Sequence, residues 1–335
     1  MKWQRLLLPF GLLYGLITWL RNQFYNWGWL HSQSFDVPVI AIGNLSMGGT
    51  GKTPMTEYLI HLLQNDFKIA VLSRGYRRTS KGFVLATSQS KVHELGDEPF
   101  QIFRKFPQIH LAVDADRCHG IQQLLTLPDA PTLILLDDAY QHRAVKAKAY
   151  VLLTAYGDLF ADDAVVPAGS LREFSLGKKR AQVVVVTKCP PNLTEKEQQQ
   201  IIGKLGVEVP VFFSKIAFSN EVVFENGNKE LSALSEFPKL LVAGIAKPQT
   251  FFDHLKQPHD LCLTFPDHHT FTEDEIKTFT NYLSNSYEYL ITTEKDEVRL
   301  KGLIPAHQLG YLPVTTQFVA HETAFQQLVR RLIID

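Results

Sequence analysis

Apolar and polar positions along this chain follow two periods, which predict strands and helices in turn. Short apolar runs rich in β-branched residues predict buried strands, and they lie at residues 39–42, 68–73, 109–113, 132–136, 149–154, 183–186, 211–218, 240–243, 289–292 and 311–319. Helical segments are predicted at residues 55–63, 100–105, 117–126, 273–285 and 321–333. The alternation of strands with helices from residue 39 to residue 215 predicts an α/β fold around a mainly parallel sheet.

The same pattern divides the chain into parts, and a length of 335 residues indicates about two domains. We predict a larger domain at residues 32–215 and a smaller α/β domain at residues 219–312. The strands at 211–218 and 311–319 are expected to pair as a two-stranded connection between the domains. The C-terminal helix, within 320–335, is expected to pack back on the larger domain.

Residues 1–31 differ from the rest of the chain. Residues 6–20 are almost wholly apolar and basic residues flank them, and four tryptophans lie within residues 1–31. Fifteen apolar residues are too few for a membrane span of about 20 residues, and no small-x-small cleavage site of a signal peptide follows. Tryptophan and arginine beside a short apolar helix favour a membrane-associated helix at the interface. A buried core helix is the alternative.

A glycine-rich stretch follows the first predicted strand. Its glycines permit a sharp turn with inward-facing N–H groups, and Lys52 and Thr53 then lead into a helix. This is the context of a phosphate-binding loop, whose lysine reaches the β- and γ-phosphates and whose threonine binds Mg²⁺. Ser46 stands where the consensus has its first glycine, so an ordinary glycine turn is the alternative. We predict a P-loop NTPase-type domain whose nucleotide-binding residues are Ser46, Met47, Gly48, Gly49, Thr50, Gly51, Lys52 and Thr53.

Acidic residues mark two further places. Asp137 and Asp138 end a strongly apolar strand, which is the Walker B arrangement that holds the Mg²⁺ of a nucleotide. Asp97 and Glu98 precede the helix predicted at 100–105, where acidic residues commonly cap a helix. The alternative for Asp97 is a general base or a residue near the metal.

Basic residues and histidines give weaker signals. Arg74, Arg77 and Arg78 follow the strand at 68–73, where they are expected either to contact phosphate or to lie in a solvated loop. Adjacent His268 and His269 cannot both face one way on a regular element, which disfavours a two-histidine metal site. A single histidine hydrogen-bonded to a carboxylate is one expectation, and a surface pair is the other.

Composition narrows the function classes. Lys and Arg together equal Asp and Glu, 34 each, which argues against a general nucleic-acid binder. The three cysteines, Cys118, Cys189 and Cys262, lie far apart without paired spacing. A disulfide framework or zinc site is therefore not expected, and a reducing compartment fits.

Taken together, the motifs resemble the tetraacyldisaccharide 4′-kinase family, the lipid A 4′-kinases of Gram-negative bacteria. The stretches that carry the resemblance keep the family's order and lie at residues 43–54, 72–76, 96–99, 137–142, 167–173, 265–269 and 293–296. Ser46 is usual in this family. Ala139 departs from it, since the family usually has glycine there, which puts the turn after the acidic strand in doubt.

The resemblance implies transfer of the γ-phosphoryl group of ATP to the 4′-hydroxyl of a tetraacylated glucosamine disaccharide 1-phosphate, with Mg²⁺. It implies a glycolipid substrate and a membrane surface at the cytoplasmic face of the bacterial inner membrane. No nucleic-acid partner is expected from the charge balance, and no obligate protein partner is evident. Asp97 is then the catalytic base, paired with His268, and Lys52 stabilises charge. Thr53, Asp137, Asp138 and Glu173 are assigned to the Mg²⁺ environment.

Two other functions compete with this one. GTPases or ATPases of the metal-chaperone or partitioning type carry similar loops, usually with an extra lysine just before the glycines, where this chain has Met47. A non-catalytic, nucleotide-gated membrane adaptor is the third possibility. Phosphoryl transfer that depends on a glycolipid acceptor would separate the kinase from both.

Overall fold

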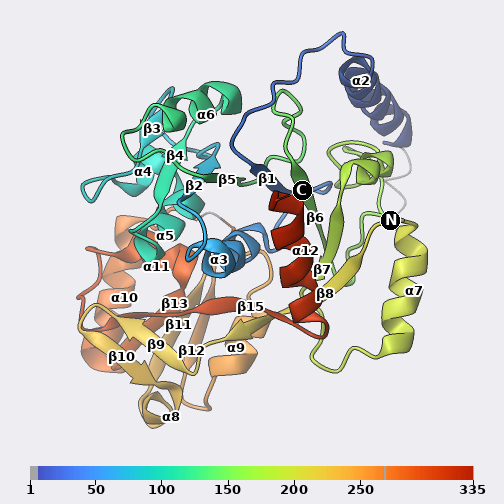
Figure 1. Cartoon of the computed structure of the whole chain (residues 1–335). Coiled ribbons are helices and arrows are strands. Elements are labelled where there is room, and N and C mark those ends of the chain that lie inside the picture. The colour runs from blue at the N-terminus through green and yellow to red at the C-terminus, as the bar shows by residue number, and fades with distance from the viewer. Residues whose placement is uncertain (1–6, 268, 335) are drawn as a thin grey trace. The chain divides into compact units, whose positions relative to one another are not determined.

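The computed structural model describes residues 7–267 and 269–334, which form two compact units. Unit 1 comprises residues Met1–Ile216 and Thr316–Asp335, and unit 2 comprises Ala217–Thr315. Each unit has its own sheet and its own hydrophobic core, and each is described by itself (Figure 1).

Unit 1 is built on a nine-stranded sheet in the order β15-β8-β7-β6-β1-β5-β2-β4-β3. Its strands are β1 (Val39–Asn44), β2 (Ile69–Ser73), β3 (Val84–Leu85), β4 (His110–Val113), β5 (Leu133–Leu136), β6 (Ala149–Ala155), β7 (Val183–Thr187), β8 (Val211–Phe218) and β15 (Val314–Phe318). The strands from β8 to β4 pair in parallel, whereas β3 pairs antiparallel with β4. The predicted parallel α/β fold is confirmed.

Helices bury both faces of this sheet, as a parallel sheet requires. Among the described residues of unit 1 the helices are α2 (Leu8–Asn26), α3 (Lys52–Leu63), α4 (Val92–Leu95), α5 (Asp97–Lys105), α6 (Arg117–Leu125), the 3₁₀ helix η1 (Ser175–Arg180), α7 (Glu195–Leu205) and α12 (Glu322–Ile334). In β1, Ile40 and Ile42 join the core under α3, α5 and α12, while Val39 and Ala41 join the core under α6. Alternate residues of one strand thus serve opposite faces.

Unit 2 has a six-stranded sheet in the order β10-β9-β14-β13-β11-β12. Its elements are β9 (Glu221–Phe224), β10 (Gly227–Glu230), α8 (Leu231–Leu234), β11 (Lys239–Ala243), α9 (Gln249–Leu255), β12 (Leu261–Thr264), α10 (Glu273–Asn285), β13 (Tyr289–Thr293), α11 (Glu294–Leu300) and β14 (Leu309–Leu312). The four strands β14, β13, β11 and β12 are parallel, and the β9–β10 hairpin extends them antiparallel. The core side chains of α9 lie on one face and those of α10 on the other.

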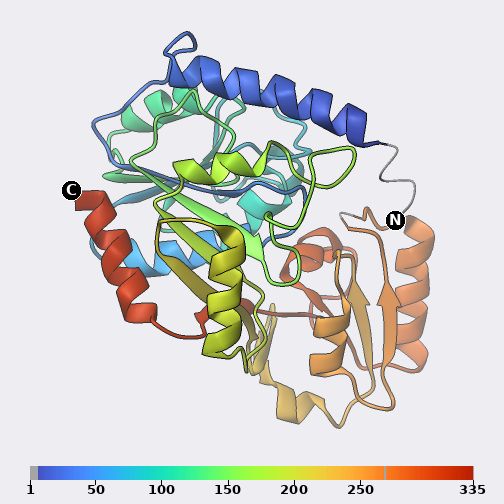
Figure 2. The same ribbon diagram turned by 90° about the vertical axis from the view of Figure 1, so that its right-hand side faces the viewer.

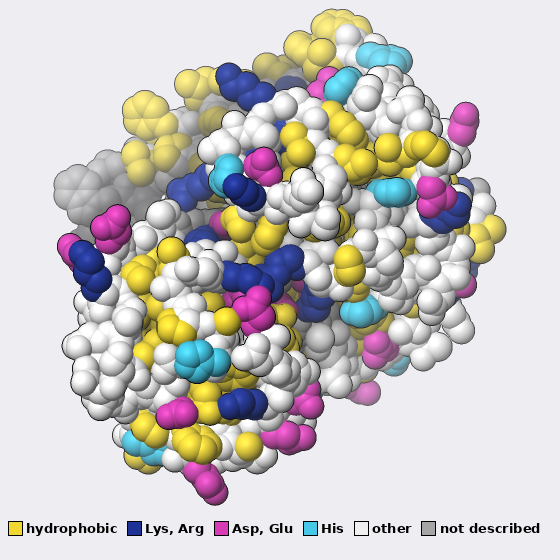
Figure 3. Space-filling model, turned by 90° about the vertical axis from the view of Figure 1, so that its left-hand side faces the viewer, with side chains coloured by type: hydrophobic (Ala, Val, Ile, Leu, Met, Phe, Trp, Pro, Cys, Tyr) yellow, Lys and Arg dark blue, Asp and Glu magenta, His cyan; other side chains and the backbone are white. Residues whose placement is uncertain are grey.

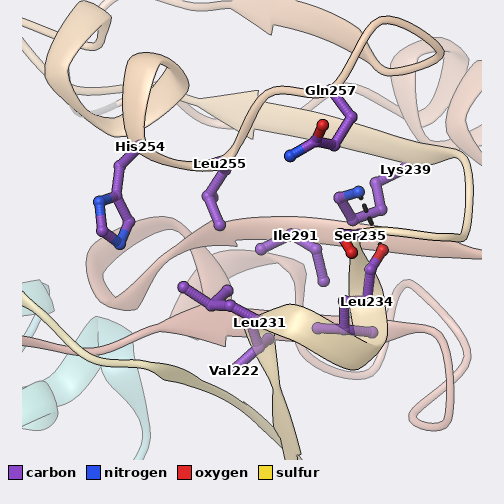
Figure 4. Close-up of a pocket in the computed structure, with 9 residues that line it drawn as sticks. All are labelled: Val222, Leu231, Leu234, Ser235, Lys239, His254, Leu255, Gln257 and Ile291. Atoms are coloured by element: carbon purple, nitrogen blue, oxygen red, sulfur yellow. Dashed lines mark hydrogen bonds between the residues drawn. The ribbon is translucent and has the colours of Figure 1, made fainter.

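A small pocket in unit 2 is lined mainly by apolar side chains, among them Val222, Leu234 and Ile291 (Figure 4). Its lysine, Lys239, is buried and already bound. The ammonium group lies 3.1 Å from Asp260 Oδ2 and donates to the carbonyl of Leu234 at 3.0 Å. We therefore interpret Lys239 as a structural residue that ties the start of β11 to its surroundings.

Three predicted element boundaries are wrong, and proline or glycine explains them. Residues 311–319 form two strands, because Pro313 has no N–H group to continue a ladder; β14 belongs to the sheet of unit 2 and β15 to that of unit 1. The helix predicted from residue 55 begins at Lys52, after the left-handed Gly51. The helix predicted from residue 100 begins at Asp97, since Pro99 is tolerated in a first turn.

Candidate functional site

Four neighbouring strands of unit 1 end at one edge of the large sheet. Strand β1 leads into the glycine loop, its neighbour β5 into Asp137, and β4 into Asp114, while β2, between β5 and β4, ends at Ser73. These strands are parallel, so their carboxyl ends lie together. Ligands of open α/β sheets bind outside such ends, which makes this edge the candidate site.

The glycine loop turns tightly from β1 into α3. Gly48 and Gly51 have φ values of +126° and +80°, a region that side chains rarely adopt. The first N–H groups of α3 have no acceptor within the helix and face the loop. Lys52 Nζ lies 3.4 Å from the carbonyl oxygen of Gly48, so the lysine folds back over its own loop. Thr50 is buried, and its hydroxyl has no hydrogen-bond partner among the described residues. The loop has the shape and the open donors that phosphate binding requires.

The first carboxylate after β5, that of Asp137, is buried and hydrogen-bonded to two hydroxyl groups. It accepts hydrogen bonds from Thr56 at 3.4 Å and from Ser73 at 3.3 Å. Burial, reinforced by the charge of Asp138, raises the pKa of Asp137 to about 6. This carboxylate therefore lacks a nearby positive charge sufficient to balance its own.

The second carboxylate is compensated. Arg172 binds Asp138 with both terminal nitrogens, at 2.9 and 3.2 Å, and Lys52 Nζ lies 3.7 Å away. Burial opposes the shift, but Lys52 and Arg172 lower the pKa of Asp138. Asp138 (φ +46°), not Ala139, takes the left-handed position of this turn. The alanine that departs from the family pattern therefore costs the turn no strain.

The loop that carries Arg172 runs beside the glycine loop. The N–H group of Met47 donates to the carbonyl of Ser170, and that of Arg172 donates to the carbonyl of Leu45, each at 2.7 Å. The backbone of Arg172 thus fixes the glycine loop while its side chain fixes Asp138. One short segment positions both halves of the candidate site.

Glu173 has a different environment from the one that the sequence predicted. It is buried, and four donors bind its oxygens: Arg180 Nη2 at 2.6 Å and Nη1 at 3.0 Å, Asn22 Nδ2 at 2.6 Å, and Gln141 Nε2 at 3.1 Å. A carboxylate has about four acceptor positions, so this one is fully used. The geometry does not favour the predicted role of Glu173 in the Mg²⁺ environment.

Asp97 is the first residue of α5, and Gly96 is its N-cap. Asp97 is therefore not the N-cap residue itself, but Asp97 and Glu98 both lie in the first turn of α5, where negative charge interacts favourably with the helix N-terminus. Gly96 (φ +91°) lies so close to the preceding loop that a Cβ atom there would be 2.9 Å from the carbonyl oxygen of Tyr76. The charge of Glu98, in the same turn, contributes to the raised pKa of Asp137. The start of α5 thus lies at the site edge.

The three arginines after β2 have different environments. Arg78 donates to the carbonyls of Val113 and Gly82, at 3.2 and 2.6 Å, and so holds its loop together. Arg77 lies over the ring of Tyr76, with 5.5 Å between the guanidinium carbon and the ring centre. Arg74 is exposed at the end of β2. Of the three, Arg74 has the position of a ligand-binding residue.

Sequence reasoning gave no role to Arg117 and His142, which the structure brings to this edge. Arg117 is buried, and burial lowers its pKa to about 10 although Asp137 and Asp138 oppose the change. Burial and the charge of Arg117 lower the pKa of His142 to about 4. The available signal was the acidic Asp114-Ala-Asp116 run before Arg117, at the end of a strand beside β2.

The predicted catalytic residue His268 lies outside the described residues, so its pairing with Asp97 stays a prediction. Its neighbour His269 is hydrogen-bonded to a carboxylate, with Nε2 2.9 Å from Glu275 Oε2, and its ring stacks on Phe265. Within residues 7–267 and 269–334, no group of three or more His, Cys, Asp or Glu side chains could hold a metal ion.

Helix α2 runs along the top of the view in Figure 2. Its glycines face the rest of unit 1, and its large apolar side chains face outward. A Cβ atom on Gly11 would lie 2.9 Å from the carbonyl oxygen of Val165, and one on Gly15 would lie 2.4 Å from the ring of Phe174. The predicted alternative of a buried core helix is wrong, because large apolar side chains are exposed on it: Phe10, Leu12, Leu13, Leu16 and Ile17.

The apolar face of α2 includes side chains as much as 63% exposed, and Trp29 beyond its end is 73% exposed. Hydrophobic side chains protrude along the upper edge of the molecule in Figure 3. In the part of the chain that the structure covers, no helix is both long enough and apolar enough to cross a membrane.

Comparisons with known proteins cover nearly the whole chain. The sequence pattern of the family described as tetraacyldisaccharide-1-P 4′-kinase matches residues 3–333. The tetraacyldisaccharide 4′-kinase of Flavobacterium johnsoniae is 50% identical over 98% of this chain and 97% of its own length, and that of Bacteroides thetaiotaomicron is 46% identical over 89% and 83%. The structure of LpxK from Aquifex aeolicus in complex with ATP is similar with a TM-score of 0.79 and 28% identity, covering 98% of this chain and 99% of that one.

Proposed function

This chain belongs to the tetraacyldisaccharide-1-P 4′-kinase family, and we propose that it transfers the γ-phosphoryl group of ATP to the 4′-hydroxyl of an acylated glucosamine disaccharide 1-phosphate, a step of lipid A biosynthesis. The observation that carries the proposal is the pairing of the glycine loop with the acidic end of β5. Lys52 spans the two, 3.4 Å from Gly48 O and 3.7 Å from Asp138 Oδ1. A lysine held between phosphate-binding amides and a Walker B carboxylate is the arrangement that phosphoryl transfer uses.

Mg²⁺ is the proposed metal, with Thr53 and Asp137 as its protein ligands. A hydroxyl and a carboxylate are hard oxygen donors, and Mg²⁺ is usually held by one or two carboxylates together with substrate phosphates and water. The raised pKa of buried Asp137 fits this role, because a divalent cation would balance the charge that burial leaves uncompensated. When bound, the ion would neutralise charge on the phosphoryl group. Asp138 orients Lys52 and Arg172 beside it.

The proposed chemistry divides between charge stabilisation and proton removal. Lys52 stabilises the negative charge that develops on the transferring phosphoryl oxygens. Asp97, half-buried in the first turn of α5, accepts the proton of the sugar hydroxyl, and His268 is the predicted partner that orients it. Phosphoryl transfer otherwise asks the protein mainly to position its reactants.

The acceptor is a lipid, and α2 is the proposed contact with its membrane. The outward face of α2 is apolar, Arg21 and two tryptophans lie near its C-terminal end, and Phe24, Trp27 and Trp29 pack ring on ring. Such helices lie in the interface plane with the apolar face toward the acyl chains. We propose peripheral or monotopic attachment to the cytoplasmic face of the bacterial inner membrane.

Mass spectrometry of the acceptor tests the function. The protein is incubated with Mg·ATP and a tetraacylated disaccharide 1-phosphate in detergent, and we expect the addition of one phosphate to the distal sugar. Lys52→Ala is the matched control, since it removes the ammonium group that lies between the glycine loop and Asp138. If the folded protein leaves the lipid unchanged, or hydrolyses ATP equally well without the lipid, the kinase assignment fails and the GTPase or ATPase alternative is favoured.

A further inference from the structure

A short segment of unit 1, residues 165–174, lies between α2 and the glycine loop, and we call it the coupling segment. On one side it receives the close approach of α2, where Gly11 faces Val165 and Gly15 faces Phe174. On the other side it pairs with the glycine loop through the bonds between Met47 and Ser170 and between Arg172 and Leu45, and through the antiparallel bridge of Ser46 with Leu171. A single segment therefore touches both the lipid-facing helix and the nucleotide-binding loop.

Side chains reinforce this path. Asn22 of α2 donates to Glu173 Oε2 at 2.6 Å, while Gln141 donates from one amide nitrogen both to Glu173 Oε1 at 3.1 Å and to the carbonyl of Asn44, the last residue of β1, at 2.9 Å. Arg172, the neighbour of Glu173, holds Asp138. Displacing α2 would leave Glu173 with one fewer donor in a buried setting, where lost hydrogen bonds are costly.

We propose that the coupling segment, with Glu173 as its positioning residue, transmits the seating of α2 on a phospholipid bilayer to the glycine loop and so raises the affinity for ATP. The inference rests on the proposed membrane contact of α2. Docking on the coupling segment holds the outward apolar face of α2 in a fixed orientation on unit 1, so the bilayer meets a preorganised face in the docked state and binds it better than a detached helix. A ligand shifts an equilibrium only through such a difference in affinity between the two states.

The proposal has a thermodynamic signature that a merely structural role lacks. If the bilayer raises ATP affinity by some factor, ATP must raise bilayer affinity by the same factor. Typical couplings are about 5- to 150-fold. We therefore expect vesicles to strengthen nucleotide binding at least about fivefold, and the nucleotide to strengthen vesicle binding equally.

The experiment uses the full chain, a non-hydrolysable ATP analogue with Mg²⁺, and vesicles of phosphatidylethanolamine and phosphatidylglycerol without any glycolipid. Calorimetric titration gives the Kd of the analogue with and without vesicles, and co-sedimentation gives vesicle binding with and without the analogue. Because no acceptor is present, the result is independent of whether the chain phosphorylates a disaccharide.

Substitutions in α2 test whether the effect of vesicles on the Kd depends on the contacts between α2 and the coupling segment. Asn22→Ala removes the bond to Glu173, and Gly15→Val forces α2 away from Phe174; both should reduce the vesicle effect on the Kd to less than twofold and leave the Kd without vesicles within twofold of wild type. Gln23→Ala is the control, since Gln23 accepts a bond from Asn26 of the same helix, and it should keep the wild-type effect. Equal Kd values with and without vesicles for the wild type, absence of vesicle binding, or an undiminished effect in both variants would overturn the proposal.

Discussion

Asp137 offers the sharpest test of the site's electrostatics, through the replacement Asp137→Asn. The folded protein holds this carboxyl with a pKa of about 6, against an ordinary value of 3.8. Between these values the folded state binds more protons than the unfolded state, so the free energy of unfolding falls as the pH rises. The stability that the protonated carboxyl contributes is fully present below about pH 4 and is lost as the pH passes 6.

The magnitude follows from the size of the shift. Roughly two pKa units at about 1.4 kcal/mol each amount to about 3 kcal/mol at neutral pH. Asparagine has nearly the same shape and carries no charge, so the variant without ligands should be more stable than the wild type by up to about that amount at pH 7.5. At pH 4 the two proteins should differ little. The variant should nevertheless lose kinase activity, because a ligand proposed for Mg²⁺ is gone.

Hydrogen exchange of the α3 amides measures this difference within unit 1, which avoids the mixed signal of two units unfolding separately. The quantity compared is the opening free energy of variant and wild type from pH 4 to pH 8. Asp129→Asn is the control, because Lys68 lowers the pKa of that exposed carboxyl and the pH trend should be absent or reversed. A stability difference that stays constant from pH 4 to pH 8 would refute the reasoning.

Three other substitutions test separate parts of the molecule. Asp97→Ala should reduce kcat by at least about 100-fold with little change in ATP affinity measured by titration, whereas equal losses in both would contradict the role of base. Arg78→Ala should lower the melting temperature of unit 1 through the loss of about 1 kcal/mol, since it leaves the partly buried carbonyl of Val113 without its donor; an unchanged melting temperature would remove its structural role. Lys239→Met should destabilise unit 2 by about 3 kcal/mol, because buried Asp260 loses its cationic partner, while calorimetry should find the ATP affinity unchanged; a weakened ATP affinity would mean that Lys239 is more than structural.

Local pattern was sufficient to predict the parts of the site that lie close in sequence. The glycine loop, Lys52 and the carboxylates after β5 each follow a buried strand within a few residues, and apolar runs locate such strands. That these segments lie at one edge of the sheet then follows, because the carboxyl ends of parallel strands meet there. The exposed apolar face of α2 was also readable, since glycines recur at i and i+4 between large apolar residues.

Glu173 shows what local pattern could not predict. Its partners are one residue 151 positions earlier, one 32 positions earlier and one seven positions later. No periodicity encodes such a meeting, because it depends on how α2 crosses the coupling segment. The same holds for Arg117 and His142, whose neighbours at the site come from separate elements.

The unsatisfied buried groups of the described chain have a distribution that bears on function. Side-chain atoms that are buried without a hydrogen-bond partner there belong to Asn44, Thr50, Arg117, Gln141, His142 and Arg180. All six are in unit 1, in or beside the glycine loop, the site edge or the contacts of Glu173. Buried polar groups without partners cost about 1–3 kcal/mol each, so a fold under selection for stability alone would not gather them at one place. Four of the six, on Asn44, Thr50, Arg117 and His142, lie in or beside the glycine loop and the site edge, and together with the raised pKa of Asp137 they support the proposal that a nucleotide binds at this edge. Bound ligand then stabilises the folded state in proportion to the logarithm of its concentration over Kd, which is how the site can be unfavourable when empty and stable in use.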